Sequence, residues 1–235
     1  MRDDSQNLVE KSYDQIAELI YSYKLPPNAV VSDFTLSKML GISRTPIRQA
    51  ILRLVTVGLV VETDGGFRVV NITPEFIVDL YEARLTLEIA MLRIAISKGF
   101  TKEDFDVLRE IANKEDDALS NSRNIEGLEY DMQFHRTLAY MSKNERLNKA
   151  YDVCYYQMKM LNVFSLAMIN QNAGKDYIEV IDCLEKGEGD KACDILQGCI
   201  EKGKLQKLKA IERFGDMGMM GIFNFIATYY ESSKK

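Results

Sequence analysis

Several features are scarce or missing in this 235-residue sequence, and each absence excludes a class of protein. No apolar stretch follows the polar first residues, so we expect no export signal. The longest apolar stretch, residues 217–230, contains Gly218 and Gly221 and is shorter than the roughly 20 apolar residues that span a membrane. We therefore expect a cytoplasmic protein without a membrane partner, in which this stretch is a buried or partner-facing helix.

Residues that carry redox, metal or catalytic chemistry are also few. The four cysteines form no CxxC pair, which favours reduced thiols over a disulfide framework. His135 is the only histidine, and no phosphate-binding loop or nucleophile motif is present. An enzyme, whether metal-dependent or working by acid and base at Asp131 and His135, is therefore the weaker alternative.

The net charge of −5 hides an uneven distribution of charge. Residues 1–72 are neutral, with eight Lys/Arg and eight Asp/Glu, so residues 73–235 carry the whole excess of acid. Between Phe34 and Val61 there are four cations and no acidic residue. A local basic region on an acidic chain is typical of a DNA-binding module joined to a sensor domain.

The N-terminal pattern predicts a winged helix-turn-helix. A first helix is expected over residues 4–23, a short helix over 33–40 and a longer one from 44 to Gly58. Ser32 and Ser43 are expected N-caps, and Leu36, Met39 and Leu40 should face inward. Two β-rich runs around Asp64-Gly65-Gly66 predict a hairpin, which is the wing.

The second helix of such a pair enters the major groove of DNA. Arg44 and Arg48 lie four residues apart and project from one side, where each can bind guanine or phosphate. Ser43 and Thr45 lie at the helix N-terminus, which suits phosphate oxygens. Gly65 keeps the wing small enough to approach the minor groove. The alternative is that Arg44 and Arg48 belong to an ordinary solvent-exposed helix face. It does not explain why these features occur together.

All of the chain beyond Pro74 is predicted to be helical, so the fold class is mainly α. We expect a DNA-binding domain over residues 1–72 and a helical effector-binding and dimerisation domain over 73–235. Thr101 and Asp104 form a predicted capping box. The predicted helices are 74–98, 101–122, 125–142, 144–170, 175–186, 189–212 and 216–230.

The chain resembles the GntR family of bacterial regulators. The resemblance rests on residues 25–27, 54 and 58–60 and on residues 36–51, LSKMLGISRTPIRQAI. Residues 79–88, DLYEARLTLE, resemble the first effector-domain helix of the FadR branch. The resemblance implies a homodimeric repressor that binds a pseudo-palindromic operator in double-stranded DNA, chiefly through Arg44, Thr45 and Arg48.

Two residues of the DNA-binding region depart from the family pattern. Phe34 stands where many relatives carry an arginine near the DNA backbone. Asp64 lies at a wing tip that should meet anionic DNA. We expect both to weaken binding or to change the operator.

The FadR-like resemblance also implies an effector pocket for a small organic acid, and in many members a divalent metal held by one Asp and three His. Asp131 and His135, at i and i+4, match the first part of that metal site. The other two histidines correspond to Tyr177 and Cys199. Because these two are equally far from a predicted turn at residues 187–189, we expect them at one height on neighbouring helices.

Three interpretations of Asp131, His135, Tyr177 and Cys199 stay open here. A metal-free pocket that binds an organic ligand ranks first, simple core filling second and a metal site third. Arg84 is the candidate partner for an anionic ligand, with an intrahelical pair to Glu88 as its alternative role. A helical scaffold for protein contacts, the remaining class, does not account for the basic helix-turn-helix.

Overall fold

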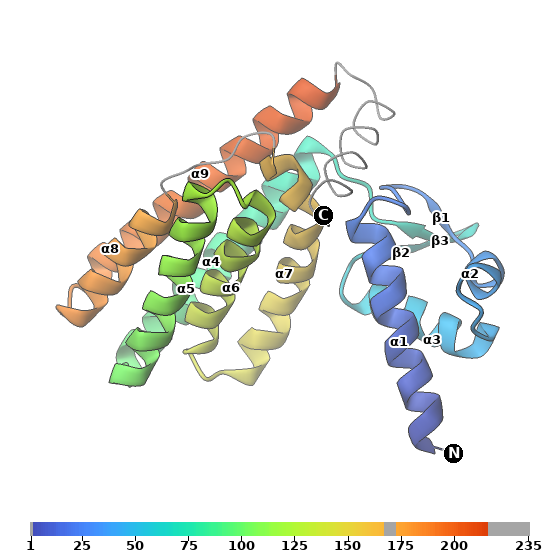
Figure 1. The fold of residues 1–235 in the computed structure, drawn as a ribbon, viewed down its shortest axis with the longest axis horizontal. Coiled ribbons are helices and arrows are strands. Elements are labelled where there is room, and N and C mark those ends of the chain that lie inside the picture. Colours follow the sequence, from blue (N-terminus) through green and yellow to red (C-terminus); the bar gives the residue numbers. More distant parts are fainter. Residues whose placement is uncertain (1, 167–172, 216–235) are drawn as a thin grey trace. The chain divides into compact units, whose positions relative to one another are not determined.

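The computed structural model describes residues 2–166 and 173–215 (Figure 1). Its contacts gather in two compact units, one holding residues 2–76 and the other residues 77–213. The chain is mainly helical, as predicted. The predicted boundary between residues 72 and 73 stays a prediction. No helix in the described ranges is long and apolar enough to cross a membrane, and the expected helix at 216–230 lies outside those ranges.

The N-terminal unit is a winged helix-turn-helix, which confirms the prediction. Its sheet is antiparallel in the order β1-β3-β2, with Val30 opposite Arg68 and Val60 opposite Val69. The elements are α1 (Arg2–Tyr21), β1 (Val30–Val31), α2 (Asp33–Leu40), α3 (Arg44–Thr56), β2 (Val60–Thr63) and β3 (Gly66–Val69).

Local sequence signals explain the helix-turn-helix, with two corrections. The Ser32 hydroxyl accepts from the Thr35 amide at 3.3 Å, and Gly41 ends α2 with φ of 66°. Ser43 holds the N-cap position of α3 but makes no side-chain capping bond. Met39, expected inside, is 55% exposed because the buried face of α2 is centred between Leu36 and the following turn.

The core of the N-terminal unit lies between α1 and α3, which pack against each other. The inward side chains of α3 are fully buried. These side chains are Ile47, Ala50, Ile51 and Leu54, and Ile16 and Ile20 of the facing α1 are fully buried as well. This packing fixes α3 from behind and leaves its opposite face open to solvent.

The second unit is an all-helical bundle in which α5 packs against α6 and α8, and α6 packs against α7. The capping box of Thr101 and Asp104 is confirmed. Gly187, with φ of 76°, lies in the predicted turn between the last two described helices. The helices are α4 (Pro74–Lys98), α5 (Lys102–Ser120), α6 (Asn124–Tyr140), α7 (Glu145–Leu166), α8 (Ala173–Glu185) and α9 (Gly189–Gly215).

Candidate DNA-binding surface and effector site

The open face of α3 presents the cations that the sequence singled out. The side chains of Arg44 and Arg48 are 61% and 63% exposed, and Ser43 and Thr45 are exposed beside them. Gly65 lies at the exposed tip of the hairpin formed by β2 and β3. All five residues are therefore accessible to a macromolecular partner.

Asp33, which the sequence reasoning missed, connects the two arginines. Its carboxylate accepts from Nη2 of Arg44 at 3.0 Å and lies 3.7 Å from Nη1 of Arg48. Exposed ion pairs contribute little free energy, about 0–1 kcal/mol, so DNA can replace Asp33 at small cost. The sequence feature that could have indicated this contact is an acidic residue, Asp33, in the first turn of α2.

Phe34 is 52% exposed and lies next to Asp33 in the first turn of α2. The ammonium of Lys38 stands 4.1 Å from the centre of its ring, a cation–π contact. Lys38 thus supplies positive charge close to Phe34 in the first turn of α2.

A buried polar network forms the centre of the helical unit. Arg84 donates through Nε to Glu88 at 2.6 Å, which confirms the intrahelical pair, and both side chains are almost fully buried. Tyr151 donates to the same Glu88 oxygen at 3.0 Å, and Nδ1 of His135 lies 2.6 Å from the other oxygen. Burial raises the pKa of Glu88, but Arg84 and His135 outweigh that effect and lower it to about 2.

The network continues from His135 to Tyr177 and Asp131. Nε2 of His135 lies 2.9 Å from the Tyr177 hydroxyl, which donates a hydrogen bond to Asp131. The Tyr177 ring stacks on Phe134 with centroids 4.2 Å apart. Hydrogen bonds therefore join three of the four predicted pocket residues directly, namely Asp131 and His135 of α6 and Tyr177 of α8.

Cys199 lines the same cavity but is not bonded to the other three predicted residues. Its thiol lies 3.8 Å from Oδ2 of Asp176, which also accepts from Lys202 at 2.9 Å. Burial, followed by the charge of Asp176, raises the pKa of Cys199 to about 12. The cysteine is therefore a neutral thiol at physiological pH.

These residues do not fit the metal site that the family resemblance implies. The Tyr177 hydroxyl bonds to both Asp131 and His135 and so occupies the place where an ion would bridge them. The thiol of Cys199 is not bonded to the other three residues and lies beside Asp176 instead. Within the described ranges, no group of three His, Cys, Asp or Glu side chains is arranged to hold an ion.

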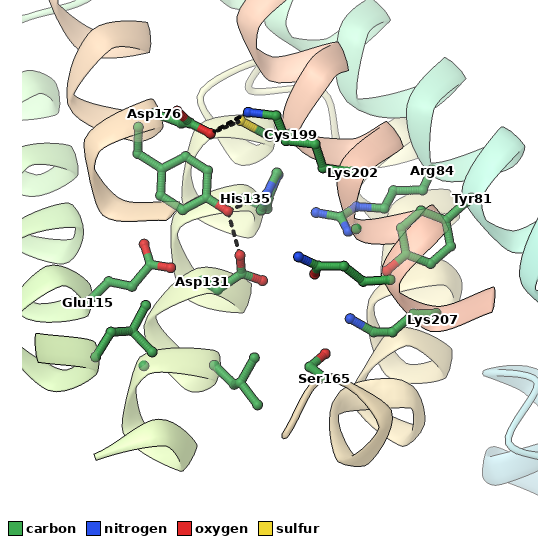
Figure 2. A pocket seen from close by; sticks show the side chains of 16 residues that line it. Tyr81, Arg84, Glu115, Asp131, His135, Ser165, Asp176, Cys199, Lys202 and Lys207 are labelled. Carbon is green, nitrogen blue, oxygen red and sulfur yellow. Dashed lines mark hydrogen bonds and ion pairs between the residues drawn. The ribbon is translucent and has the colours of Figure 1, made fainter. Parts of the chain in front are cut away.

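A cavity of about 70 Å³ lies beside this network (Figure 2). Arg84, Asp131, His135, Tyr177 and Cys199 all line it, so the structure brings the five predicted effector residues to one place. Sequence reasoning missed three further buried polar residues on its wall, which are Glu115, Ser165 and Lys207.

Glu115 is 1% exposed, and its Oε2 has no hydrogen-bond partner among the described residues. Burial, followed by the charges of Asp131 and Asp116, raises the pKa of Glu115 to about 10. The carboxyl group is therefore protonated at neutral pH. The sequence feature that could have indicated this buried residue is that Glu115 is the one carboxylate in the apolar stripe of α5. The stripe runs through Leu108, Ile111, Ala112, Ala118 and Leu119.

Glu115→Gln is expected to raise the melting temperature more at pH 8 than at pH 5. The folded-state pKa lies above the unfolded value, so the stabilisation linked to the proton is complete below about pH 4.5 and declines towards pH 10. Glutamine has nearly the same shape as glutamate but does not titrate, so the variant does not lose this stabilisation as the pH rises. Thermal melts of both proteins across this range measure the difference, and parallel curves for the two proteins would contradict the raised pKa.

A winged helix-turn-helix with a basic second helix, followed by an all-helical bundle, defines a class of DNA-binding proteins. Comparison with known families gives the particular assignment. Residues 8–69 match the bacterial regulatory proteins of the gntR family, and residues 79–202 match the FCD domain. The chain belongs to the GntR family of bacterial regulatory proteins, in its FadR-like branch with an FCD C-terminal domain.

Similar proteins are regulators and not enzymes, as we predicted. The Nta operon transcriptional regulator of Aminobacter aminovorans is 34% identical over 54% of this chain and 60% of its own length. The Uxu operon regulator of Haemophilus influenzae is 31% identical over 63% of this chain and 61% of its own length. The matched regions thus span about three fifths of these relatives.

The fold has a solved counterpart. The structure of E. coli McbR/YncC aligns with a TM-score of 0.72 and covers 88% of this chain and 98% of its own, at 19% sequence identity. At that identity the likeness supports the shared fold alone.

Proposed function

We propose that the protein is a homodimeric repressor that binds a pseudo-palindromic operator and responds to a small organic acid. Arg44, Thr45 and Arg48 contact the DNA, Ser43 approaches its phosphates at the start of α3, and Gly65 approaches the minor groove at the wing. The ligand binds in the cavity lined by Arg84, Asp131, His135, Tyr177 and Cys199. A dimer presents two copies of α3, so its operator has two related half-sites.

The observation that carries the ligand proposal is the set of unsatisfied polar groups in the cavity wall. Oε2 of Glu115 and Oγ of Ser165 are buried without hydrogen-bond partners in the described part of the chain. Each such group costs about 1–3 kcal/mol unless a partner satisfies it. A ligand that reaches these atoms recovers that free energy and stabilises the conformation that holds it.

The two functions are connected by a short segment. Only residues 70–73 separate β3 of the wing from α4, and α4 carries both Arg84 and Glu88 of the ligand cavity. A ligand-dependent shift of α4 therefore changes the position of the wing and α3. Coupling free energies of about 1–3 kcal/mol alter affinity roughly 5–150-fold.

A thermal-shift screen of metabolite acids, sugar acids and acyl compounds, followed by operator titration with each hit, tests this proposal. Tyr177→Phe removes the hydroxyl that joins His135 to Asp131, so it should weaken the response to a hit at least about 5-fold while the protein stays folded. His135→Ala should act in the same direction. Tyr156→Phe is the matched control, since Tyr156 does not line the cavity. If Tyr177→Phe and His135→Ala respond like wild type, this cavity is not the sensor.

We also expect the purified protein to carry little tightly bound divalent metal. The reason is that Tyr177 and Cys199 stand where the family pattern has histidines, and the Tyr177 hydroxyl already engages Asp131 and His135. Elemental analysis of protein prepared without added metal measures this. Zinc or nickel near one ion per chain would show that Asp131, His135 and Cys199 rearrange into ligands.

A further inference from the structure

The charges that line the cavity are not all paired. Arg84 is matched by Glu88 at 2.6 Å, and Lys202 is matched by Asp176 at 2.9 Å. Lys207 is only 8% exposed and has no ion-pair partner in the described part of the chain.

Asp131 is the acidic counterpart of this unpaired lysine. Its carboxylate accepts a hydrogen bond from Tyr177 and interacts electrostatically with Arg84, but it forms no direct ion pair with any described cation. The wall therefore holds one unmatched cation and one unmatched anion.

The unmatched groups lie on different sides of the cavity. Figure 2 shows Lys207 and Ser165 reaching in from α9 and α7, while Glu115 and Asp131 enter from α5 and α6. The Ser165 hydroxyl is 3% exposed and lacks a partner among the described residues, as does Oε2 of Glu115. One side thus offers an ammonium and a hydroxyl, and the other offers two carboxyl groups.

We infer that the cavity binds a small zwitterion, an α-amino acid, whose carboxylate pairs with Lys207 and Ser165 and whose ammonium group faces Asp131 and Glu115. This inference rests on the proposed ligand-sensing function and names the class of its ligand. The amino acid supplies a negative charge to Lys207, which has no ion-pair partner among the described residues, and a positive charge to the side of the wall that carries Asp131 and Glu115.

Other small ligands leave one of these charges uncompensated. A hydroxy acid matches Lys207 but gives Asp131 no cation, and an amine without a carboxylate matches Asp131 but not Lys207. Lys207 is buried, and an unpaired charge in such a place is strongly unfavourable, whereas Asp131 is only partly buried and its charge costs less when unpaired. Paired, hydrogen-bonded charges in the same place are favourable, so the zwitterion is the better complement.

The size of the cavity agrees with a small amino acid. Its volume of about 70 Å³ has room for on the order of five to seven water-sized groups. Glycine, alanine and serine have about as many non-hydrogen atoms. A ligand with a large side chain would exceed this volume.

Isothermal titration of the full-length protein with matched ligands tests the inference. The zwitterions are glycine, L-alanine and L-serine, the matching hydroxy acids are glycolate, L-lactate and L-glycerate, and L-alaninamide lacks the carboxylate. We expect at least one amino acid to bind at least about tenfold more tightly than its hydroxy acid. Alaninamide should bind no better than the hydroxy acids.

Three variants assign the two ends of the ligand. Lys207→Gln and Asp131→Asn should each weaken amino-acid binding at least about tenfold. Lys209→Gln removes an exposed charge from the same helix and should leave binding unchanged. Ser165→Ala, a smaller change, should weaken binding severalfold and provides a readout if Asp131→Asn fails to fold.

The outcomes separate this inference from the proposed function. If hydroxy acids bind more tightly and only Lys207→Gln weakens them, the ligand is a simple acid, so the zwitterion is wrong but the sensing cavity remains. If none of these ligands binds, the amino-acid class is also wrong. The response of Tyr177→Phe in the wider acid screen then decides whether the cavity senses anything.

Discussion

Glu88→Ala is expected to destabilise the helical unit by about 3–5 kcal/mol, the largest stability effect among the predictions. Glu88 accepts hydrogen bonds from Arg84 and Tyr151 and contacts Nδ1 of His135, all deep in the bundle. Its removal leaves the Arg84 guanidinium buried without its counter-charge. Equilibrium urea unfolding, followed by helical circular dichroism, measures the loss.

Two further variants identify the cause of that loss. Glu110→Ala removes an exposed glutamate that pairs only with Lys114, so it should change stability by less than about 0.5 kcal/mol. Combining Arg84→Met with Glu88→Leu removes both buried charges, and it should recover a large part of the stability lost in Glu88→Ala. If Glu88→Ala unfolds like wild type, the network does not stabilise the bundle.

Sequence reasoning was most successful where the structural cause is local. The Arg84–Glu88 pair follows from i,i+4 spacing on one helix, and the Thr101 capping box follows from three-residue spacing. The left-handed Gly41 ends α2 because glycine has no Cβ to oppose that conformation. Such interactions join residues within one turn, so the order of residues fixes them before any tertiary contact forms.

The site itself depends on contacts between distant parts of the chain. Glu88 and His135 are 47 residues apart, and Asp131 and Tyr177 are 46 apart, so no spacing rule joins them. The sequence indicated that Tyr177 and Cys199 share one height, but only the packing of α5 and α7 adds Glu115 and Ser165 to the same cavity.

Errors arose where tertiary context decided a local question. Met39 fits the apolar spacing of α2, but this two-turn helix has a narrow buried face and Met39 lies beyond its edge. Ser43 has the right residue type and position for a cap, yet its hydroxyl makes no capping bond. Both residues lie on the side of the helix-turn-helix that is open to solvent.

Arg48→Ala is expected to weaken operator binding by about 1–3 kcal/mol, or roughly 5–150-fold, if Arg48 reads a base. Its side chain is 63% exposed on the open face of α3, and its only ion pair there, with Asp33 at 3.7 Å, is long and weak. The variant should therefore fold as stably as wild type, so the loss falls on binding. Fluorescence anisotropy with an operator duplex at fixed salt measures it.

A control variant and a scrambled duplex distinguish base recognition by Arg48 from the general attraction of DNA to positive charge. Lys114→Ala removes one exposed cation from α5 in the other unit and controls for net charge. A base contact makes Arg48→Ala lose more affinity for the operator than for a scrambled duplex, whereas a phosphate contact weakens both about equally and lowers the salt dependence. If Arg48→Ala binds the operator as tightly as Lys114→Ala does, Arg48 has no part in recognition, and the exposed cations of α3 form only a solvated face.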